Sequence, residues 1–300
     1  MLVRTYPLSG PLDLRRTLAP LGRGSGDRTI RFAANRAWRA TRTPDGPAAV
    51  SLEHLGDKVR AEAWGPGAER ALDGMPALLG FGQVPEAFDV AHPTVTHLAR
   101  RFAGVRIPRS GAVLESLVPA ILEQKVIGEE ARRAWFELVR RHGEAAPGPP
   151  ELGLRLPPAP ATLAALPYFA YHPLGVERRR AELIRRVAAR AAWFEAIVDL
   201  PMADAYARLT AVPGIGPWTA AEVAVRSLGD IDAVSVGDFH LPNLVAFALA
   251  GEPRGTDARM LELLEPYRGH RARVIRWLEL SGIRAPRYGP RLSLRRIEET

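Results

Sequence analysis

The segment VPGIGPWT, residues 212–219, constrains the fold of this 300-residue chain more than any other stretch. Its glycines, Gly214 and Gly216, permit positive φ values and let another molecule approach the backbone closely. Pro217 suits the first position of a helix, where its missing N–H has no acceptor to lose. The residues before the segment read as a short helix, and Gly229 suits the C′ position after the second helix. The segment therefore predicts a hairpin between two helices.

A hairpin of this kind offers a site for an anion. The N–H groups of the turn and of the second helix's first turn lack intrahelical acceptors, and the helix dipole favours negative charge there. A phosphate group is the natural ligand. A Gly-x-Gly turn is also a common connector between packed helices, so the rest of the chain must decide between the two interpretations.

The composition narrows the class of protein. The chain has 41 Lys and Arg against 33 Asp and Glu, a formal net charge of +8 that favours a polyanionic partner. It has no cysteine, which excludes disulfides, thiol catalysis and cysteine-bound zinc or iron–sulfur clusters. His92 and His97 have no acidic partner at metal-ligand spacing, so we expect them to be ordinary helix residues. Because no run of about 18 apolar residues occurs, we expect no membrane partner and a cytoplasmic, DNA-accessible location.

The hydrophobic pattern divides the chain into three parts. Residues 1–88 read as an α+β domain in which short alternating runs form an antiparallel sheet with helices beside it. Residues 89–284 read as an all-α region of two helical lobes, with a Pro- and Gly-rich linker at 144–160. Residues 285–300 form a basic tail. The predicted fold class is mainly α with an N-terminal α+β domain.

Several local features are specific enough to test. Asp13 is predicted to cap a helix over residues 14–21, and a second helix covers 69–79. Residues 110–142 form one long amphipathic helical stretch, and the linker is expected to be an exposed excursion. Six arginines between residues 178 and 190 form either a phosphate-facing stripe or a solvated face paired with glutamates.

Four segments together resemble a known family. They are VPGIGPWTA at 212–220, AILEQKVIGEEA at 120–131, LGVERRRAELI at 174–184 and YRGHRARVIRWLEL at 267–280. These segments are similar to the helix-hairpin-helix DNA glycosylases, and within that superfamily to the 3-methyladenine DNA glycosylase II type. The resemblance implies a monomer without a cofactor, whose partner is double-stranded DNA containing damaged bases.

The resemblance also implies site residues. Asp238 would be the catalytic carboxylate that stabilises an oxocarbenium-like transition state and orients water. Asp230 and Asp232, which precede it, are expected to be turn and capping residues. The hairpin carbonyls near Val212 and Ile215 are candidate ligands for a monovalent ion, and no other metal is expected. The predicted DNA-binding residues are Gln124, Lys125, Gly214, Gly216, Thr219, Arg268 and Arg271.

Three residues are predicted to form the base pocket. Trp218 would stack on the base or serve as a core tryptophan, and it occupies the position where relatives that cleave the strand have a Schiff-base lysine. We therefore expect a monofunctional hydrolase. Glu222 stands where relatives have Tyr, and it either enters the pocket or pairs with Arg226 four residues on. His270 replaces a Trp of the family.

Three functions follow as hypotheses. The leading one is a base-excision glycosylase for alkylated purines of the 3-methyladenine or 7-methylguanine type. Glu222, His270 and Lys125 depart from the family pattern and favour a glycosylase of the same fold for another lesion, such as a deaminated or oxidised base. A third hypothesis is a catalytically silent helix-hairpin-helix protein that binds DNA, against which the presence of Asp238 argues.

Overall fold

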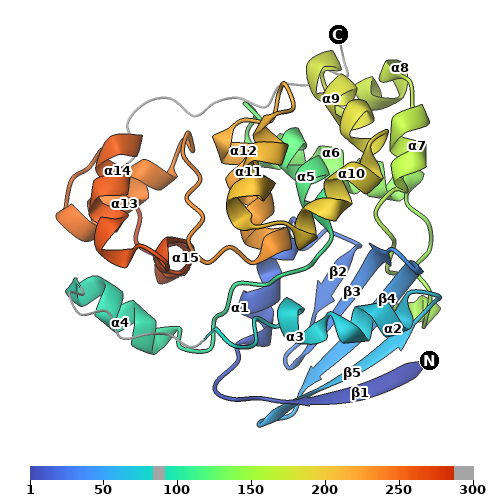
Figure 1. The fold of residues 1–300 in the computed structure, drawn as a ribbon, viewed down its shortest axis with the longest axis horizontal. Coiled ribbons are helices and arrows are strands. Elements are labelled where there is room, and N and C mark those ends of the chain that lie inside the picture. Colours follow the sequence, from blue (N-terminus) through green and yellow to red (C-terminus); the bar gives the residue numbers. More distant parts are fainter. Residues whose placement is uncertain (84–91, 287–300) are drawn as a thin grey trace.

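The structure, a computed structural model, describes residues 1–83 and 92–286. An antiparallel sheet at the N-terminus lies beside a larger body of helices (Figure 1). This confirms the predicted fold class, mainly α with an N-terminal helix-backed sheet. The predicted boundary at 88/89 and most of the predicted tail at 285–300 lie outside the described residues.

The sheet has five strands in the order β1-β5-β4-β3-β2, all antiparallel. Strand β5 alternates between buried and more exposed side chains, with Val59, Ala61 and Ala63 buried. This alternation places one face of the sheet against a core that helices complete. The strands are β1 (Leu2–Pro7), β2 (Ile30–Phe32), β3 (Arg36–Thr43), β4 (Gly46–His54) and β5 (Lys58–Trp64).

Short helices cover this face of the sheet. Helix α1 (Leu14–Leu18) begins at Asp13, whose carboxylate accepts the Arg16 N–H at 2.8 Å, which confirms the predicted cap. The predicted helix 14–21 ends early and continues as a 3₁₀ turn, Ala19–Leu21. The predicted helix 69–79 is two helices, α2 (Ala68–Asp73) and α3 (Met75–Leu78), divided at Gly74.

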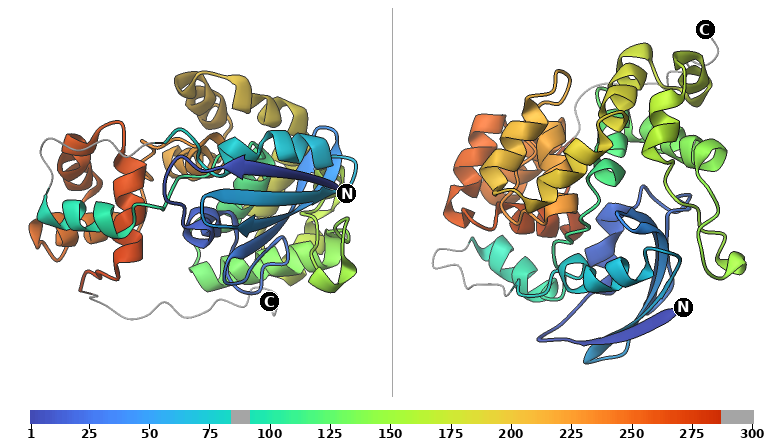
Figure 2. Two further views of the ribbon diagram at one scale, coloured as in Figure 1. Left: turned by 90° about the horizontal axis from the view of Figure 1, so that it is seen from below. Right: turned by 45° about the vertical axis from the view of Figure 1, so that its right-hand side comes forward.

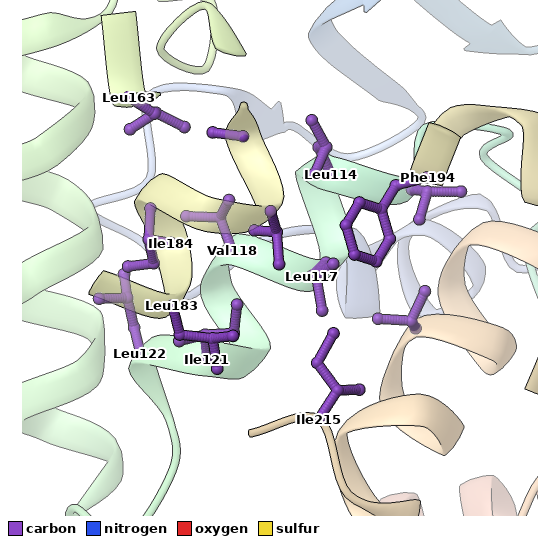
Figure 3. Close-up of a cluster of buried hydrophobic side chains, with 14 of the residues drawn as sticks. Leu114, Leu117, Val118, Ile121, Leu122, Leu163, Leu183, Ile184, Phe194 and Ile215 are labelled. Atoms are coloured by element: carbon purple, nitrogen blue, oxygen red, sulfur yellow. The ribbon is translucent and has the colours of Figure 1, made fainter. Parts of the chain in front are cut away.

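The helical body contains two apolar cores. One gathers around α5, with side chains from α7, α9, α10 and the hairpin residue Ile215 directed toward it (Figure 3). The other joins α4 to α13, α14 and α15, although α4 lies far earlier in the chain (Figure 2). The helices are α4 (Pro93–Arg101), α5 (Val113–Leu122), α6 (Gly128–His142), α7 (Pro160–Ala165), α8 (Tyr168–Tyr171), α9 (Arg178–Ala188), α10 (Ala191–Glu195), α11 (Met202–Thr210), α12 (Pro217–Val223), α13 (Leu241–Ala250), α14 (Asp257–Leu264) and α15 (Arg271–Ser281).

Two predictions for the middle of the chain were wrong. The stretch 110–142 is broken between α5 and α6, where Lys125 adopts φ +56°, which ends a helix because side chains rarely tolerate it. The linker 144–160 is not an exposed excursion. Its Leu154 and Leu156 are buried against Ala40 of β3, and its Arg155 N–H bonds to the Arg28 carbonyl.

The helix-hairpin-helix is formed by α11, residues 211–216 and α12. Gly214 has φ +101°, as predicted, whereas Gly216 is extended at φ −94° and ψ 180° and does not use a positive φ. Pro217 opens α12 at the predicted first position. Helix α12 passes into a π-helical turn, Ala224–Leu228, which ends at Gly229 with φ +69°. No helix in the described ranges is long and apolar enough to cross a membrane.

Candidate active site

Asp238 lies in the loop between the π-helical turn and α13. Its Oδ1 accepts the backbone N–H groups of His240 at 2.7 Å and Leu241 at 2.8 Å, so the carboxylate caps the start of α13. Its Oδ2 accepts the indole N–H of Trp218 at 3.0 Å. Two elements that are 20 residues apart therefore hold one carboxylate in a fixed orientation.

Trp218 occupies the second position of α12, directly after Pro217. The structure places its indole beside Asp238, and its side chain is not among those that line the cavity described below. The second residue of the hairpin helix thus holds the predicted catalytic carboxylate.

A cavity of about 420 Å³ opens beside Asp238. Its walls come from six parts of the chain: residues 20–23 after α1, residues 107 and 108, the end of α12 with its π-helical turn, the loop residues 233–238, the start of α13, and α15. The N-terminal region therefore supplies one wall. Asp238 and His240 line the cavity where α13 begins.

Charged side chains dominate part of this lining. Glu222 accepts hydrogen bonds from Arg226 Nη1 at 2.5 Å and from Ser235 Oγ at 2.6 Å. It also lines the cavity, so pairing with Arg226 does not keep it out of the cavity wall. Burial raises the pKa of Glu222, but Arg226 and the Ser235 hydrogen bond outweigh that effect and leave the pKa below its usual value.

Arginines reach the cavity from two further directions. Arg23 is buried, and this desolvation, with Arg226 nearby, lowers the pKa of its guanidinium. Arg276 of α15 donates Nη1 to Glu279 at 3.1 Å and Nη2 to the Arg16 carbonyl at 3.2 Å. Desolvation raises the pKa of Glu279. Both Arg276 and Glu279 line the cavity.

The predicted residues at the start of α15 lie elsewhere. His270 precedes α15 and is not among the side chains that line the cavity. Arg271 donates Nε to Asp232 Oδ1 at 2.8 Å and Nη2 to Asp232 Oδ2 at 2.5 Å, and the hydrogen bond to Asp232 raises the pKa of Arg271. Arg268 pairs with Glu265 at 2.8 Å on the surface.

The two neighbouring aspartates have structural partners. Asp232 accepts the backbone N–H groups of Gly269 at 2.7 Å and Arg271 at 3.1 Å, which fixes the start of α15. Asp230 accepts the Tyr206 hydroxyl at 2.9 Å and the Asp232 N–H at 2.9 Å. These contacts agree with the expectation that both residues serve turns and caps.

Gln124 and Thr219 form hydrogen bonds that hold the hairpin on its protein-facing side. Gln124 Nε2 donates to the Gly214 carbonyl at 3.0 Å and to Thr219 Oγ1 at 2.9 Å, and Thr219 is buried. Lys125, next to Gln124, is exposed. The structure thus gives Gln124 and Thr219 an internal contact, whereas Lys125 lies at the surface.

The hairpin carbonyls are partly engaged. The Val212 carbonyl accepts the Ile215 N–H at 2.9 Å, and the Pro213 carbonyl accepts Arg186 Nη2 at 2.8 Å. A monovalent ion near Val212 and Ile215 stays a prediction. Within residues 1–83 and 92–286, no group of three His, Asp or Glu side chains is arranged to hold a metal.

The arginines of α9 make several internal contacts. Arg180 is buried and donates to the Leu122 carbonyl at 2.7 Å, while Arg178 pairs with Glu182 at 2.6 Å. Arg190 lies over the Trp193 ring at 4.1 Å. Arg178 therefore fits the interpretation of a solvated face paired with glutamates, whereas Arg180 and Arg190 make contacts that neither interpretation included.

Sequence reasoning missed several residues of the cavity. Arg23 comes from the N-terminal α+β region, in which no site residue was predicted, and Arg276 and Glu279 lie six or more residues beyond His270 in the same family-like segment. The i, i+3 spacing of Arg276 and Glu279 on α15 was an available signal. Arg23 carried no local signal, because only the tertiary fold brings it to α12.

Known proteins share part of this sequence and the fold. No protein-family model matches the chain. Two curated proteins from strains of Mycobacterium tuberculosis, each named a probable bifunctional transcriptional activator/DNA repair enzyme AlkA, are 30% identical to it over 226 residues. The match covers 72% of this chain and 44% of those proteins, so the chain spans less than half the length of these relatives.

Solved structures have the same fold. The 3-methyladenine DNA glycosylase from Archaeoglobus fulgidus superposes with a TM-score of 0.76 at 20% identity, over 92% of this chain and 97% of that chain. The Clostridium acetobutylicum 8-oxoguanine glycosylase/lyase, solved with double-stranded DNA, gives 0.66 at 13% identity, over 93% and 96%. The chain therefore has the fold of helix-hairpin-helix DNA glycosylases, and over 72% of its length its sequence is similar to that of the AlkA proteins.

Proposed function

We propose that this protein is a DNA glycosylase that hydrolyses the N-glycosidic bond of a damaged nucleotide, with Asp238 as the catalytic carboxylate. The observation that carries the proposal is the position of Asp238 at the edge of a 420 Å³ cavity, held by Trp218 and by the start of α13. The names of the relatives support a DNA repair enzyme, and that of the Archaeoglobus structure supports alkylated purines as the substrate class.

The chemistry follows from this placement. A base stacked in a duplex is out of reach, so the nucleotide must be flipped, at a cost of about a few kcal/mol that is smallest for damaged bases. The base then enters the cavity, and the sugar C1′ lies beside Asp238. As the glycosidic bond breaks, positive charge develops on the sugar, and the carboxylate stabilises it and orients the attacking water.

The backbone of the DNA needs a separate anchor. The hairpin at residues 211–216 and the first turn of α12 present N–H groups without intrahelical acceptors, which suit a phosphate. An added Cβ at Gly216 would meet no atom within 4 Å, so the surface there is open to a close approach. Lys125, Arg268 and other surface arginines would add electrostatic attraction to double-stranded DNA.

We also propose that the enzyme is a monofunctional hydrolase that acts as a monomer. A lyase needs an amine that attacks C1′. The two lysines of the chain are Lys58 in β5 and Lys125, and Trp218 occupies the hairpin-helix position that a Schiff-base lysine would take. The expected product is an abasic site in an unbroken strand.

Replacement of the carboxylate tests the proposal. Asp238→Asn should abolish release of free base from lesion-containing duplexes, measured by mass spectrometry, while salt-sensitive DNA binding is retained. Asp204→Asn, an exposed aspartate of α11, is the matched control and should keep wild-type release. Treatment of the wild-type reaction with borohydride should trap no enzyme–DNA adduct.

Two outcomes would contradict the proposal. A wild-type protein that binds DNA but releases no base from a broad lesion panel would be a silent binding protein. Base release that survives Asp238→Asn would place the catalytic group elsewhere.

A further inference from the structure

Helix α9 packs directly against the hairpin. Leu183 of α9 and the hairpin residue Ile215 belong to one buried apolar cluster, in which Figure 3 shows both side chains. A Cβ added at Gly214 would lie 3.0 Å from Leu183 Cδ2, so α9 approaches the hairpin closely at this point. Arg186 of the same helix donates Nη2 to the Pro213 carbonyl at 2.8 Å. The surface of α9 is therefore continuous with that of the hairpin.

The face of α9 beside the hairpin carries two exposed arginines, Arg179 and Arg186. Arg179 lies four residues before Leu183 and seven before Arg186, a spacing that puts all three side chains on one face of a helix. Seven residues extend about 10 Å along a helix axis. One strand of duplex DNA covers that distance in about three nucleotides.

The positive charge of this face is not neutralised within the protein. The two glutamates of the segment are bound to other arginines, Glu182 to Arg178 at 2.6 Å and Glu177 to Arg180 at 3.4 Å. Among the residues that the structure describes, neither exposed arginine of the face forms an ion pair. A guanidinium has five N–H donors, and Arg186 uses only Nη2 on the hairpin. Phosphate oxygens match both the charge and the geometry of the remaining donors.

Resting on the glycosylase function proposed above, we propose that Arg179 and Arg186 form a second phosphate-binding surface, which extends the hairpin site along the DNA backbone. Arg186 has two roles, because Nη2 holds the Pro213 carbonyl while its other donors bind a phosphate. Arg179 has the second role alone. The surface acts on any duplex, since contacts to phosphates position a protein without reading the sequence.

The salt dependence of DNA binding tests this surface. The probe is a duplex with a tetrahydrofuran abasic-site analogue at its centre, and fluorescence anisotropy gives the Kd over a series of NaCl concentrations. Each phosphate contact contributes about 0.9 to the slope of log K against log[salt]. Arg179→Met and Arg186→Gln should each make the slope about 0.9 shallower, and the double variant about 1.8 shallower.

Further variants separate the charge of Arg186 from its bond to the hairpin. Arg186→Gln removes the charge but keeps an amide donor for the hairpin carbonyl, so urea denaturation should show a stability close to that of wild type. Arg179→Lys and Arg186→Lys keep the charge and should keep the wild-type slope. Arg140→Met is the matched control, because it removes an exposed charge of α6 that is paired with Glu137 at 2.6 Å. Its slope should equal that of wild type.

The outcomes separate the two proposals. A wild-type slope in Arg179→Met or in Arg186→Gln would overturn the second phosphate surface and leave the glycosylase function intact. Weaker binding by Arg186→Gln with an unchanged slope would mean that Arg186 only supports the hairpin. An equal change of slope in Arg140→Met would also overturn the surface, because net charge alone would explain it. Shallower slopes in a protein whose wild type releases no base from any lesion would overturn the glycosylase function and leave the DNA-binding surface.

Discussion

Both carboxylate oxygens of Asp238 accept hydrogen bonds, and the donor to Oδ2 is the indole of Trp218, which lies just after the hairpin. Trp218→Phe keeps an aromatic ring and removes only the N–H that donates to Asp238 Oδ2 at 3.0 Å. A hydrogen bond to a charged group contributes about 1.5–3 kcal/mol, so we expect the single-turnover rate of base release to fall about tenfold or more. Binding of undamaged DNA should change little.

The control for this variant is Trp193→Phe. Trp193 lies between Arg190 and Arg208, away from the carboxylate, and its replacement should leave the rate of base release unchanged. A Trp218→Phe enzyme that is as fast as wild type would mean that the two backbone N–H groups orient Asp238 without help from the indole.

The hairpin contains two glycines, Gly214 and Gly216, whose substitution by Ala can be compared directly. At Gly214, with φ +101°, a new Cβ would lie 3.0 Å from Leu183 Cδ2. Gly214→Ala should therefore lower the free energy of unfolding by about 1–3 kcal/mol, measured by urea denaturation. At Gly216 the backbone is extended and an added Cβ meets nothing within 4 Å. Gly216→Ala should leave stability within about 1 kcal/mol of wild type.

DNA binding separates the two glycines further. Gly216→Ala places a methyl group on the open surface of the hairpin, so fluorescence anisotropy should show weaker DNA binding by a protein of nearly normal stability. Equal stability of both variants would contradict the packing described for Gly214.

The same elements show what local sequence predicts. The hairpin, Pro217 at the first position of α12, the cap at Asp13 and the end at Gly229 depend on the residues themselves, and each was predicted correctly. The break between α5 and α6 was missed, because residues 123–127 contain no Gly or Pro and Lys125 is not a residue type that favours its φ of +56°. The packing of 144–160 was missed because β3, its partner, is remote in sequence.

The candidate site also contains residues that the local sequence predicts and residues that it does not. The predicted positions of Asp238 and Trp218 rest on motifs within one segment, and the structure brings these two side chains together. His270 and Arg271 lie in a family-like segment too, yet Arg271 is bound to Asp232 and neither lines the cavity. Arg23 became visible only in three dimensions, because its contribution depends on how residues 20–23 meet α12.

For the whole molecule, the segment between α1 and β2 takes part in the site because it is fixed to the helices. Arg226 Nε donates to the Pro20 carbonyl at 3.0 Å, and Trp135 Nε1 donates to the buried Asp27 at 3.0 Å. Asp27 in turn accepts the Arg23 N–H at 2.9 Å. The wall that carries Arg23 is thus bonded to α6 and to the end of α12, so the cavity requires both parts of the chain.

Glu115 makes the most concentrated connection between the two parts. This first-turn residue of α5 accepts hydrogen bonds from Arg39 Nη2 at 2.6 Å, Thr41 Oγ1 at 2.9 Å and the Arg42 N–H at 2.7 Å, all from β3. Glu115→Ala leaves Arg39, which is 7% exposed, as a buried charge without its carboxylate. The loss of one partner from a buried pair costs about 3–5 kcal/mol, and we expect urea denaturation to show a decrease of that size.

Glu182→Ala is the matched control, because it removes a helical carboxylate whose ion pair with Arg178 is exposed, and its effect should be far smaller. If the sheet and the helices fold as one unit, fluorescence and far-UV circular dichroism should report the same single transition for Glu115→Ala, shifted to lower urea. Two separate transitions would show that Glu115 joins parts that are stable independently. A loss no larger than that of Glu182→Ala would mean that the contacts of Pro20 and Asp27 hold the sheet against the helices by themselves.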